Sequence, residues 1–336
     1  MNEVVLVTTY RRPELLHCCL KRIREAEPSI PISVFPDRGT LYDAELQEVI
    51  KAFPGNIQWN LVPDHDYYGN SYNVMEAFRW AYNEGYDVVY YVEDDVMCHP
   101  DFFTWHCEQH EEVPDLFGSM GWIFNRHAPI SDDVLYAPWY YAIGTCFLRA
   151  KLEKIACHAT PKYYEDMPGY ITQEFADCSL NRERLQFGIE HYEQDGLIQR
   201  VLERDKSTCA SPGIAKCSHV GFAGYNRGWN GYAEFFNEKS QMNFAERIAR
   251  LEEFIADPYA RAEIFGRDIV EREIGYELPR RILDYTVKLP GGWESSFTSE
   301  RLLTERNRPA KVNSVRVTPE MVIEKTVDTL RNKPLP

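Results

Sequence analysis

The stretch DVVYYVEDDV, residues 87–96, joins a short apolar run to three consecutive carboxylates. The apolar part has the length of one strand, and a run of this kind is typical of a strand buried on both faces of a sheet. Glu93, Asp94 and Asp95 follow the run directly, so they lie at the carboxyl end of the predicted strand. Ligands of parallel sheets bind beyond the carboxyl ends of the strands, which makes this triplet the first candidate for a functional site.

Three similar strand-and-helix units precede this strand. The predicted strands cover residues 4–7, 31–35 and 57–61, and the predicted helices cover residues 13–23, 42–53 and 70–83. Pro13 suits the first turn of the first helix, Asn70 or Ser71 suits the cap of the third, and Gly85 suits its end. Repeated alternation of strand and helix predicts an α/β fold with a mostly parallel, Rossmann-like central sheet that is flanked by helices.

The acidic triplet requires compensation of its charge. Three adjacent carboxylates at the end of a buried strand repel one another unless a cation or hydrogen-bond donors are close. Hard oxygen ligands that leave coordination positions open suit Mg²⁺ or Mn²⁺ that carries a nucleoside diphosphate. The alternative is a solvated acidic turn. The apolar strand before the triplet and the aromatic segment after it favour the metal site over that alternative.

Polar residues also follow the first two predicted strands. Thr8 and Thr9 follow the first strand, and Asp37 follows the second. These residues and the triplet converge on one edge of the predicted sheet, where turn amides and hydroxyls face a ligand. We therefore expect Thr8, Thr9 and Arg11 to contact a nucleotide, with solvated charge as the alternative for Arg11. Arg227 is a candidate partner for a diphosphate, with a plain surface position as its alternative.

Composition excludes several classes of protein. The 336 residues contain 37 Lys and Arg against 52 Asp and Glu, a net charge of −15, which is unlike the basic footprint of a nucleic-acid coat. No apolar run reaches the roughly 18 residues of a membrane span, and the first residues do not match a signal peptide. The nine cysteines form no Cys-x-x-Cys pair, so we expect reduced thiols and a cytoplasmic protein.

The composition changes along the chain. Residues 100–235 are dense in Trp, Tyr and Gly, whereas residues 244–269 have a charged, helical pattern. We therefore expect a catalytic domain over residues 1–238 and a mainly helical C-terminal extension over residues 239–336. The pattern assigns no role to that extension.

Over residues 3 to 230 the chain resembles the GT-A-fold glycosyltransferases that use nucleotide sugars. Residues 7–16 are similar to the first strand and helix of that family, and Glu93-Asp94-Asp95 is similar to its DxD motif. The form Glu-Asp-Asp with a following Pro-Asp-Phe-Phe, residues 100–103, is closest to the inverting N-acetylglucosaminyltransferase I-like enzymes. Further similar segments are Asp37, Gly69-Asn70 through Asn73, Gly144 through Arg149, and Glu193-Gln194-Asp195.

This resemblance implies roles for individual residues. It implies that Asp95 holds Mn²⁺ or Mg²⁺ and that His219 completes the metal shell, a role that imidazole can fill, or touches the diphosphate. The alternative for His219 is a structural histidine. The donor-binding residues implied by the resemblance, in addition to those above, are Asp37 for the base or ribose, Asn70, Asn73, Glu93, Asp94 for the ribose or sugar hydroxyls, and Gly144 beside the sugar pocket.

The resemblance also implies a catalytic base near residue 195. Asp195 is the first candidate and Glu193 the second. Gln194 separates two carboxylates that are often adjacent in the family, so the choice between them stays open. A carboxylate in this place takes the proton of the acceptor hydroxyl. The alternative for Asp195 is a helix-start carboxylate that the helix dipole favours.

The leading hypothesis is a metal-dependent, inverting glycosyltransferase, hexosyl or pentosyl, that uses a UDP-sugar by default and a hydroxyl acceptor. One alternative is a viral-type enzyme that glycosylates hydroxymethylated pyrimidines in DNA, for which the basic stretch 301–316 would meet phosphate. Another is a sugar nucleotidyltransferase, which the absence of glycine from Thr-Thr-Tyr-Arg-Arg-Pro disfavours. The last is a non-catalytic module that binds a nucleotide sugar or a glycan.

Overall fold

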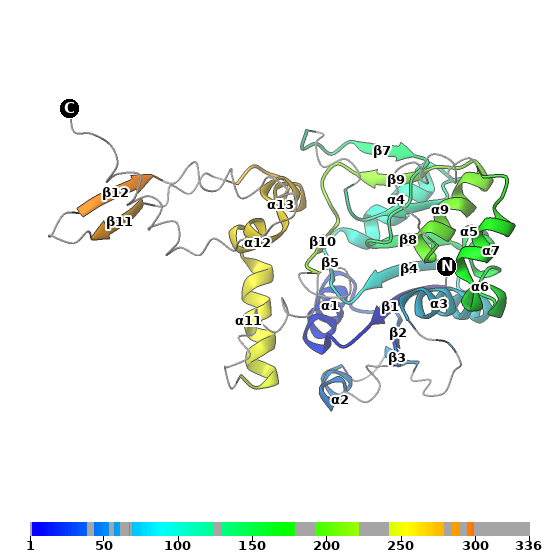
Figure 1. Ribbon diagram of the computed structural model, residues 1–336, viewed down its shortest axis with the longest axis horizontal. Helices are drawn as coiled ribbons and strands as arrows, with labels where there is room; N and C mark the ends of the chain where they lie inside the picture. Colours follow the sequence, from blue (N-terminus) through cyan, green and yellow to red (C-terminus); the bar gives the residue numbers. More distant parts are fainter. Residues whose placement is uncertain are drawn as a thin grey trace. The chain divides into compact units, whose positions relative to one another are not determined.

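The chain forms two compact units, Met1–Leu278 and Pro279–Pro336. The computed structural model describes residues 2–38, 44–53, 57–60, 67, 69–123, 129–178, 192–221 and 242–278, together with the backbone of residues 284–288 and 294–298. The first unit contains the large sheet and its helices, and the second contains two paired strands (Figure 1).

The first unit is built on a sheet with the strand order β3-β2-β1-β4-β8-β6-β9-β7. Its strands are β1 (Glu3–Thr9), β2 (Ile32–Pro36), β3 (Ile57–Trp59), β4 (Val88–Glu93), β6 (Gly118–Met120), β7 (Val134–Ala137), β8 (Thr145–Leu148) and β9 (Cys209–Pro212). All of them except β8 and β7 run in one direction. The predicted fold class, an α/β fold whose central sheet is mostly parallel and flanked by helices, is confirmed.

Helices cover both faces of this sheet (Figure 1). They are α1 (Pro13–Ala26), α2 (Ala44–Ala52), α3 (Asn70–Glu84), α4 (Phe102–Glu112), α5 (Arg149–Ala156), α6 (Pro161–Glu165), α7 (Met167–Glu174), α9 (Gln194–Asp205), α11 (Phe244–Ala256), α12 (Pro258–Phe265) and α13 (Arg267–Ile274). One large apolar core joins the sheet to α1, α2, α4 and α11, and a second joins it to α3, α5, α6, α7 and α9.

The side chains of the central strands β1 and β4 point alternately into the two apolar cores. In β4, Tyr90 belongs to the core on the α1 side and Tyr91 to the core on the α3 side, and both are fully buried. Successive side chains of a strand point to opposite faces, so an apolar run without interruption is what a strand between two helical layers requires. This explains why residues 4–7 and 88–92 could be recognised as central strands.

The register of the parallel strands brings their polar ends together. Thr8 of β1 lies opposite Glu93 of β4, and Thr9 lies opposite Pro36 of β2. Asp37 follows β2, and its backbone N–H donates to the carbonyl of Thr9 over 2.9 Å. Three strand ends that are far apart in the sequence therefore meet at one edge of the sheet.

The start of α3 differs from the predicted cap. Gly69, with φ of 98°, caps the helix, and neither Asn70 nor Ser71 does so. The Ser71 hydroxyl instead donates to the side-chain oxygen of Gln194 over 2.6 Å, because it faces the start of α9. The predicted helix end is confirmed, since Gly85 adopts the left-handed conformation with φ of 84°.

Beyond residue 238 the described residues are first helical and then extended. Helix α11 packs against α1, where Arg247 forms ion pairs with Glu14 and Glu45. In the second unit β11 (Asp284–Lys288) and β12 (Glu294–Thr298) pair antiparallel. The expected boundary between residues 238 and 239 and the basic stretch 301–316 both lie outside the described residues, so that boundary stays a prediction. Among the described helices, none combines the length and the apolar character that a bilayer crossing needs.

Candidate functional site

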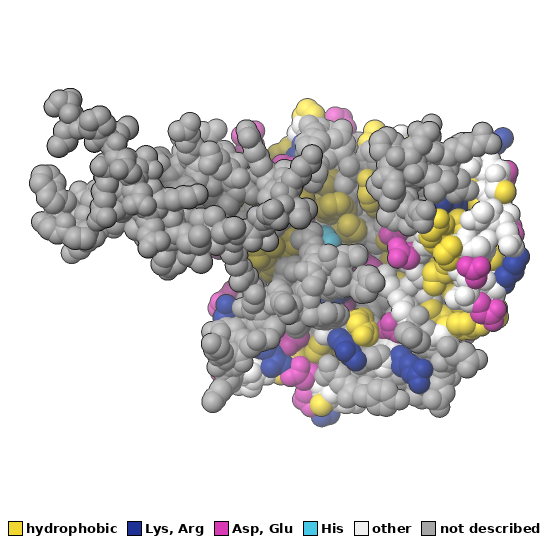
Figure 2. Space-filling model, in the orientation of Figure 1, with side chains coloured by type: hydrophobic (Ala, Val, Ile, Leu, Met, Phe, Trp, Pro, Cys, Tyr) yellow, Lys and Arg dark blue, Asp and Glu magenta, His cyan; other side chains and the backbone are white. Residues whose placement is uncertain are grey.

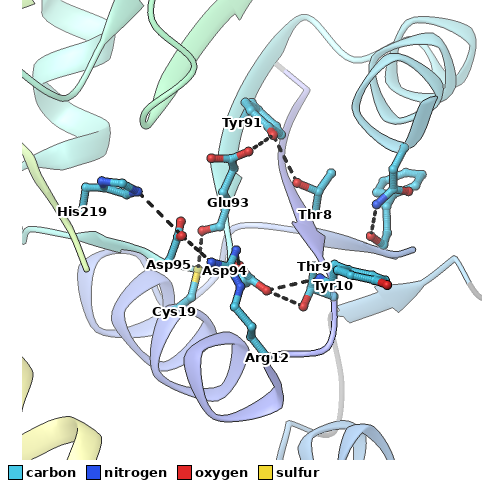
Figure 3. A network of polar contacts seen from close by, with 12 residues as sticks. Thr8, Thr9, Tyr10, Arg12, Cys19, Tyr91, Glu93, Asp94, Asp95 and His219 are labelled. Atoms are coloured by element: carbon cyan, nitrogen blue, oxygen red, sulfur yellow. Dashed lines mark hydrogen bonds and ion pairs between the residues drawn. The ribbon is translucent and has the colours of Figure 1, made fainter. Parts of the chain in front are cut away.

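The centre of the candidate site is a contact between the β1–α1 turn and the acidic triplet after β4 (Figure 3). Asp94 is fully buried, and its Oδ2 accepts hydrogen bonds from the Thr9 hydroxyl over 2.6 Å and the Tyr10 backbone N–H over 3.4 Å. Its other oxygen forms an ion pair with Arg12. Asp94 therefore fixes the turn that follows β1, and its predicted contact with the ribose or sugar stays a prediction.

The two carboxylate oxygens of Asp95 differ in their contacts. The Arg12 guanidinium lies 2.6 Å from Oδ2, and His219 Nε2 lies 3.6 Å from the same atom. Oδ1 is buried, and no hydrogen-bond partner for it exists among the described residues. A buried carboxylate oxygen without a partner is costly, so this atom marks a place where a ligand would be bound.

Arg12 is the residue that sequence reasoning missed at this site. Its guanidinium spans Asp94 and Asp95, whereas the neighbouring Arg11, which we expected to contact a nucleotide, is exposed and lies over the ring of Tyr10 at 5.3 Å. The rule that buried carboxylates need a cation was available from the sequence. It did not say which of two adjacent arginines turns inward, because that depends on the turn, where Arg11 has φ of 53°.

The buried charges shift one another's ionisation. Burial opposes the charged form of Arg12, but attraction by Asp94 and Asp95 outweighs it and raises the pKa of the guanidinium. Burial likewise opposes ionisation of Asp95, but Arg12 and His219 hold the pKa of this carboxyl well below its usual range. For Asp94, burial is the largest effect, and it raises the pKa of this carboxyl to about 6. Asp95 is therefore the more acidic carboxylate of the pair.

Glu93 is the first carboxylate of the triplet and is directed at the side chain of Tyr91 (Figure 3). Its Oε1 accepts a hydrogen bond from the Tyr91 hydroxyl over 3.2 Å, and that hydroxyl lies 3.1 Å from the hydroxyl of Thr8. Desolvation, followed by repulsion from Asp95 and Asp195, raises the pKa of Glu93 to about 8. The electrostatic effect of Asp195 on Glu93 means that the structure brings these two predicted site residues together.

The start of α9 places the two candidate bases. Glu193 is the cap of this helix and Asp195 lies in its first turn, while the intervening Gln194 is buried against Ser71. Both carboxylates reach solvent. Desolvation by the surrounding protein, with Glu193 as the second cause, raises the pKa of Asp195 to about 6. Figure 2, in the orientation of Figure 1, shows several acidic side chains near the middle of the visible face of the first unit.

Other predicted donor-binding residues form the joint between β2 and α3. The carboxylate of Asp37 is buried and accepts from the backbone N–H groups of Arg38, over 2.7 Å, and Gly69, over 3.1 Å. The Asn73 amide donates to the carbonyl of Phe35 over 2.7 Å, whereas Asn70 is exposed. These contacts hold the joint beside Thr9, so they place the residues at the edge without testing their contact with a donor.

Gly144 and Gly221 lie close to the strand β10 (Cys217–His219). A Cβ atom on Gly144 would lie 2.8 Å from the Cys217 sulfur, so this glycine permits close packing behind β10. A Cβ atom on Gly221 would lie 2.4 Å from Oδ2 of Asp95 and 2.8 Å from Nε2 of His219. The sequence reading did not single out Gly221, and Arg227 lies outside the described residues.

The structure thus brings most of the predicted residues to one edge of the sheet. Those in the polar network of Figure 3 are Thr8, Thr9, Glu93, Asp94, Asp95 and His219. Asp195 is electrostatically linked to that network, and Asp37 and Asn73 lie at the neighbouring joint. No group of three or more His, Cys, Asp or Glu side chains among the described residues is arranged to hold a metal ion by itself.

No family model matches the sequence, and no curated protein is similar to it in sequence. Solved structures with a distantly similar chain path include a mannosyltransferase from Pyrobaculum calidifontis in complex with GDP-Man and Mn²⁺ (14% identity, 77% of this chain and 71% of that chain, TM-score 0.45). Others are TarS of S. aureus in complex with UDP-GlcNAc (14%, 80% and 74%, TM-score 0.43) and the galactosyltransferase LgtC with donor and acceptor sugar analogues (12%, 62% and 72%, TM-score 0.38). At these identities and TM-scores the likeness says nothing of substrate or activity.

Replacing Arg12 tests the role of its charge. In Arg12→Met two buried carboxylates lose their cation, so we expect the free energy of unfolding at pH 7 to fall by about 3–5 kcal/mol. The loss should shrink as the pH falls towards 4, because protonation then removes the uncompensated negative charge. Urea denaturation at both pH values measures the effect, with the exposed Arg11→Met as the matched control. Equal stability of Arg12→Met and the wild type at pH 7 would contradict this account.

Proposed function

We propose that the chain is a glycosyltransferase that transfers a sugar from a nucleoside diphosphate sugar to a hydroxyl acceptor and depends on a divalent cation. The observation that carries the proposal is the buried Oδ1 of Asp95, which has no hydrogen-bond partner among the described residues. It belongs to a carboxylate whose Oδ2 lies 3.6 Å from His219 Nε2 and whose charge cluster, at the edge of the sheet, includes Asp195. These elements provide a place for the leaving diphosphate and a base for the acceptor.

The residues around Asp95 fit a divalent cation. Asp95 offers a charged oxygen without a partner among the described residues, and His219 offers a ring nitrogen directed at the same carboxylate. Gly221 has no side chain to fill the space beside Oδ2 of the same carboxylate and Nε2 of His219. Two protein donors suit an ion such as Mn²⁺ or Mg²⁺ that takes its other ligands from water and substrate phosphates.

When bound, the cation would stabilise the negative charge that develops on the departing diphosphate. Arg12 holds Asp94 and Asp95 in place, and its own charge lies at the same edge. Asp37 and Thr8 stand at the neighbouring strand ends, where the base, ribose and sugar of a donor would lie. The default donor is a UDP-sugar, although GDP-Man and UDP-GlcNAc are both present in the similar structures.

Asp195 is the base that we propose for the acceptor. Its carboxylate would take the proton of the acceptor hydroxyl while the hydroxyl oxygen forms a bond to the anomeric carbon and the bond from that carbon to the phosphate oxygen breaks. A single displacement of this kind inverts the anomeric centre. A pKa of about 6 leaves Asp195 ionised at neutral pH and still able to accept a proton. Glu193, at the cap of the same helix, is the second candidate.

The proposal predicts release of a nucleoside diphosphate. Purified protein with Mn²⁺ should liberate the diphosphate from one member of a panel of UDP- and GDP-sugars, slowly with water and faster with an acceptor sugar. Asp95→Asn should lower the rate by at least about 100-fold, because several kcal/mol of charge stabilisation is lost. Asp132→Asn, an exposed carboxylate away from the site, is the control. Unchanged turnover in Asp95→Asn would refute the metal assignment.

A methyl group at residue 221 should interfere with the cation. In Gly221→Ala the Cβ atom displaces Asp95 or His219, so we expect the affinity for Mn²⁺ to fall by about tenfold. The electron paramagnetic resonance signal of free Mn²⁺ measures this directly. Gly85→Ala, at the left-handed end of α3, is a control that costs about 1 kcal/mol of stability and leaves Mn²⁺ binding unchanged. If both variants bind Mn²⁺ equally well, the space beside Gly221 is not the metal site.

The pH dependence of turnover should identify the base. Protonation of Asp195 removes the base, so kcat/KM should fall tenfold per pH unit below about pH 6. Asp195→Asn should lose about 10²–10⁴-fold in rate, together with this acidic limb of the profile. Glu193→Gln, at the same helix start, should keep both. The reverse pattern would assign the base to Glu193.

A further inference from the structure

A buried carboxylate of α13 supports the strand that carries His219. Glu273 is only 3% exposed, and its Oε1 accepts from the backbone N–H of His219 over 3.2 Å and from the indole N–H of Trp122 over 3.5 Å. Its other oxygen pairs with Arg261 of α12, which is also buried. The same acceptor atom therefore serves two residues that lie next to each other at the site.

The strand register explains why His219 needs this acceptor. Strand β10 pairs antiparallel with β5 (Val96–Cys98), and the hydrogen bonds between the strands include His99 N–H to Lys216 and Val220 N–H to Asp95. In this alternation His219 and its opposite residue Val96 form a non-hydrogen-bonded pair, so the N–H of His219 points away from β5. The acceptor that the structure gives this N–H is Oε1 of Glu273.

Glu273 also influences where the imidazole of His219 lies. The Trp122 ring meets the imidazole edge-on, with 6.2 Å between ring centroids, and the indole N–H is tied to the carboxylate that also holds the His219 backbone. A second link between α13 and this region is the hydrogen bond from Ala215 N–H to the Arg272 carbonyl over 3.0 Å. The backbone of His219 thus bonds directly to Glu273 of α13, and its ring packs against Trp122, which bonds to the same carboxylate.

We propose that Glu273 is a positioning residue that directs His219 towards Asp95 for binding of the divalent cation, and that α12 and α13 are therefore part of the functional site. This inference rests on the proposed function. Outer groups that orient a metal ligand commonly change metal affinity by 10–100-fold when they are replaced. Glu273 contacts the backbone of His219 and the ring of Trp122, so its effect on cation binding would pass through His219.

The experiment separates positioning from simple stabilisation. In Glu273→Gln the side chain keeps its shape and one acceptor oxygen but loses its charge. The double variant Arg261→Met with Glu273→Leu replaces the buried ion pair by apolar groups, a change that often preserves stability. Glu263→Gln, an exposed carboxylate on α12, is the control with the same loss of charge. Binding of Mn²⁺ alone is measured by electron paramagnetic resonance, and folding by thermal melting.

We expect Glu263→Gln to bind Mn²⁺ as the wild type does, Glu273→Gln to bind it several-fold more weakly, and the double variant to bind it at least tenfold more weakly although it melts near the wild-type temperature. A double variant that is folded and binds Mn²⁺ normally would show that the pair only stabilises the fold and would overturn the inference. If the double variant does not fold, normal Mn²⁺ binding by Glu273→Gln overturns it.

A failure of the proposed function gives a different result. If the wild type itself does not bind Mn²⁺, the metal assignment at Asp95 and His219 is wrong, and the inference about Glu273 is wrong with it. If the wild type and Glu263→Gln bind Mn²⁺ and both Glu273 variants do so equally well, the metal assignment stands and only the positioning role is lost.

Discussion

The contact of Arg12 with two adjacent carboxylates is the interaction on which this edge of the protein depends. Asp94 and Asp95 are buried at the end of β4, where their charges would repel each other without a counter-ion. Arg12 lies in the turn between β1 and α1, and its charge compensates both carboxylates. Because its guanidinium also leaves one oxygen of Asp95 without a partner among the described residues, it stabilises the fold without closing the site. A cation that binds there adds to this arrangement or competes with Arg12 for Asp95.

The central part of the fold could be predicted because local signals agree with the tertiary environment. Residues 4–7 and 88–92 are apolar without interruption since both faces of their strands are covered by helices. Parallel pairing then places Thr8 and Glu93 at the same edge, so the region of the site follows from the strand pattern alone. The start of α3 was not predictable in the same way. Ser71 has the chemistry of a cap, but its hydroxyl bonds Gln194, which is distant in the sequence.

The finer structure of the site depends on contacts that a single sequence does not encode locally. Adjacent arginines at residues 11 and 12 have the same chemistry, and only the backbone of the turn decides that the second one faces Asp94. Glu273 lies far along the chain, in the predicted C-terminal extension to which the pattern assigned no role, yet it is buried and accepts from the backbone N–H of His219. Such second-layer residues become visible only when the strand register shows which backbone groups need an acceptor.

The two consecutive tyrosines of β4 have a consequence for the chemistry at its end. Tyr90 and Tyr91 lie on opposite sides of the sheet, and each is fully buried in a different apolar core. Sliding the strand by one position would invert every side chain on it, the carboxylates included. The register that places this strand between two cores thus also decides that Asp94 and Asp95 meet Arg12 while Glu93 meets the hydroxyl of Tyr91.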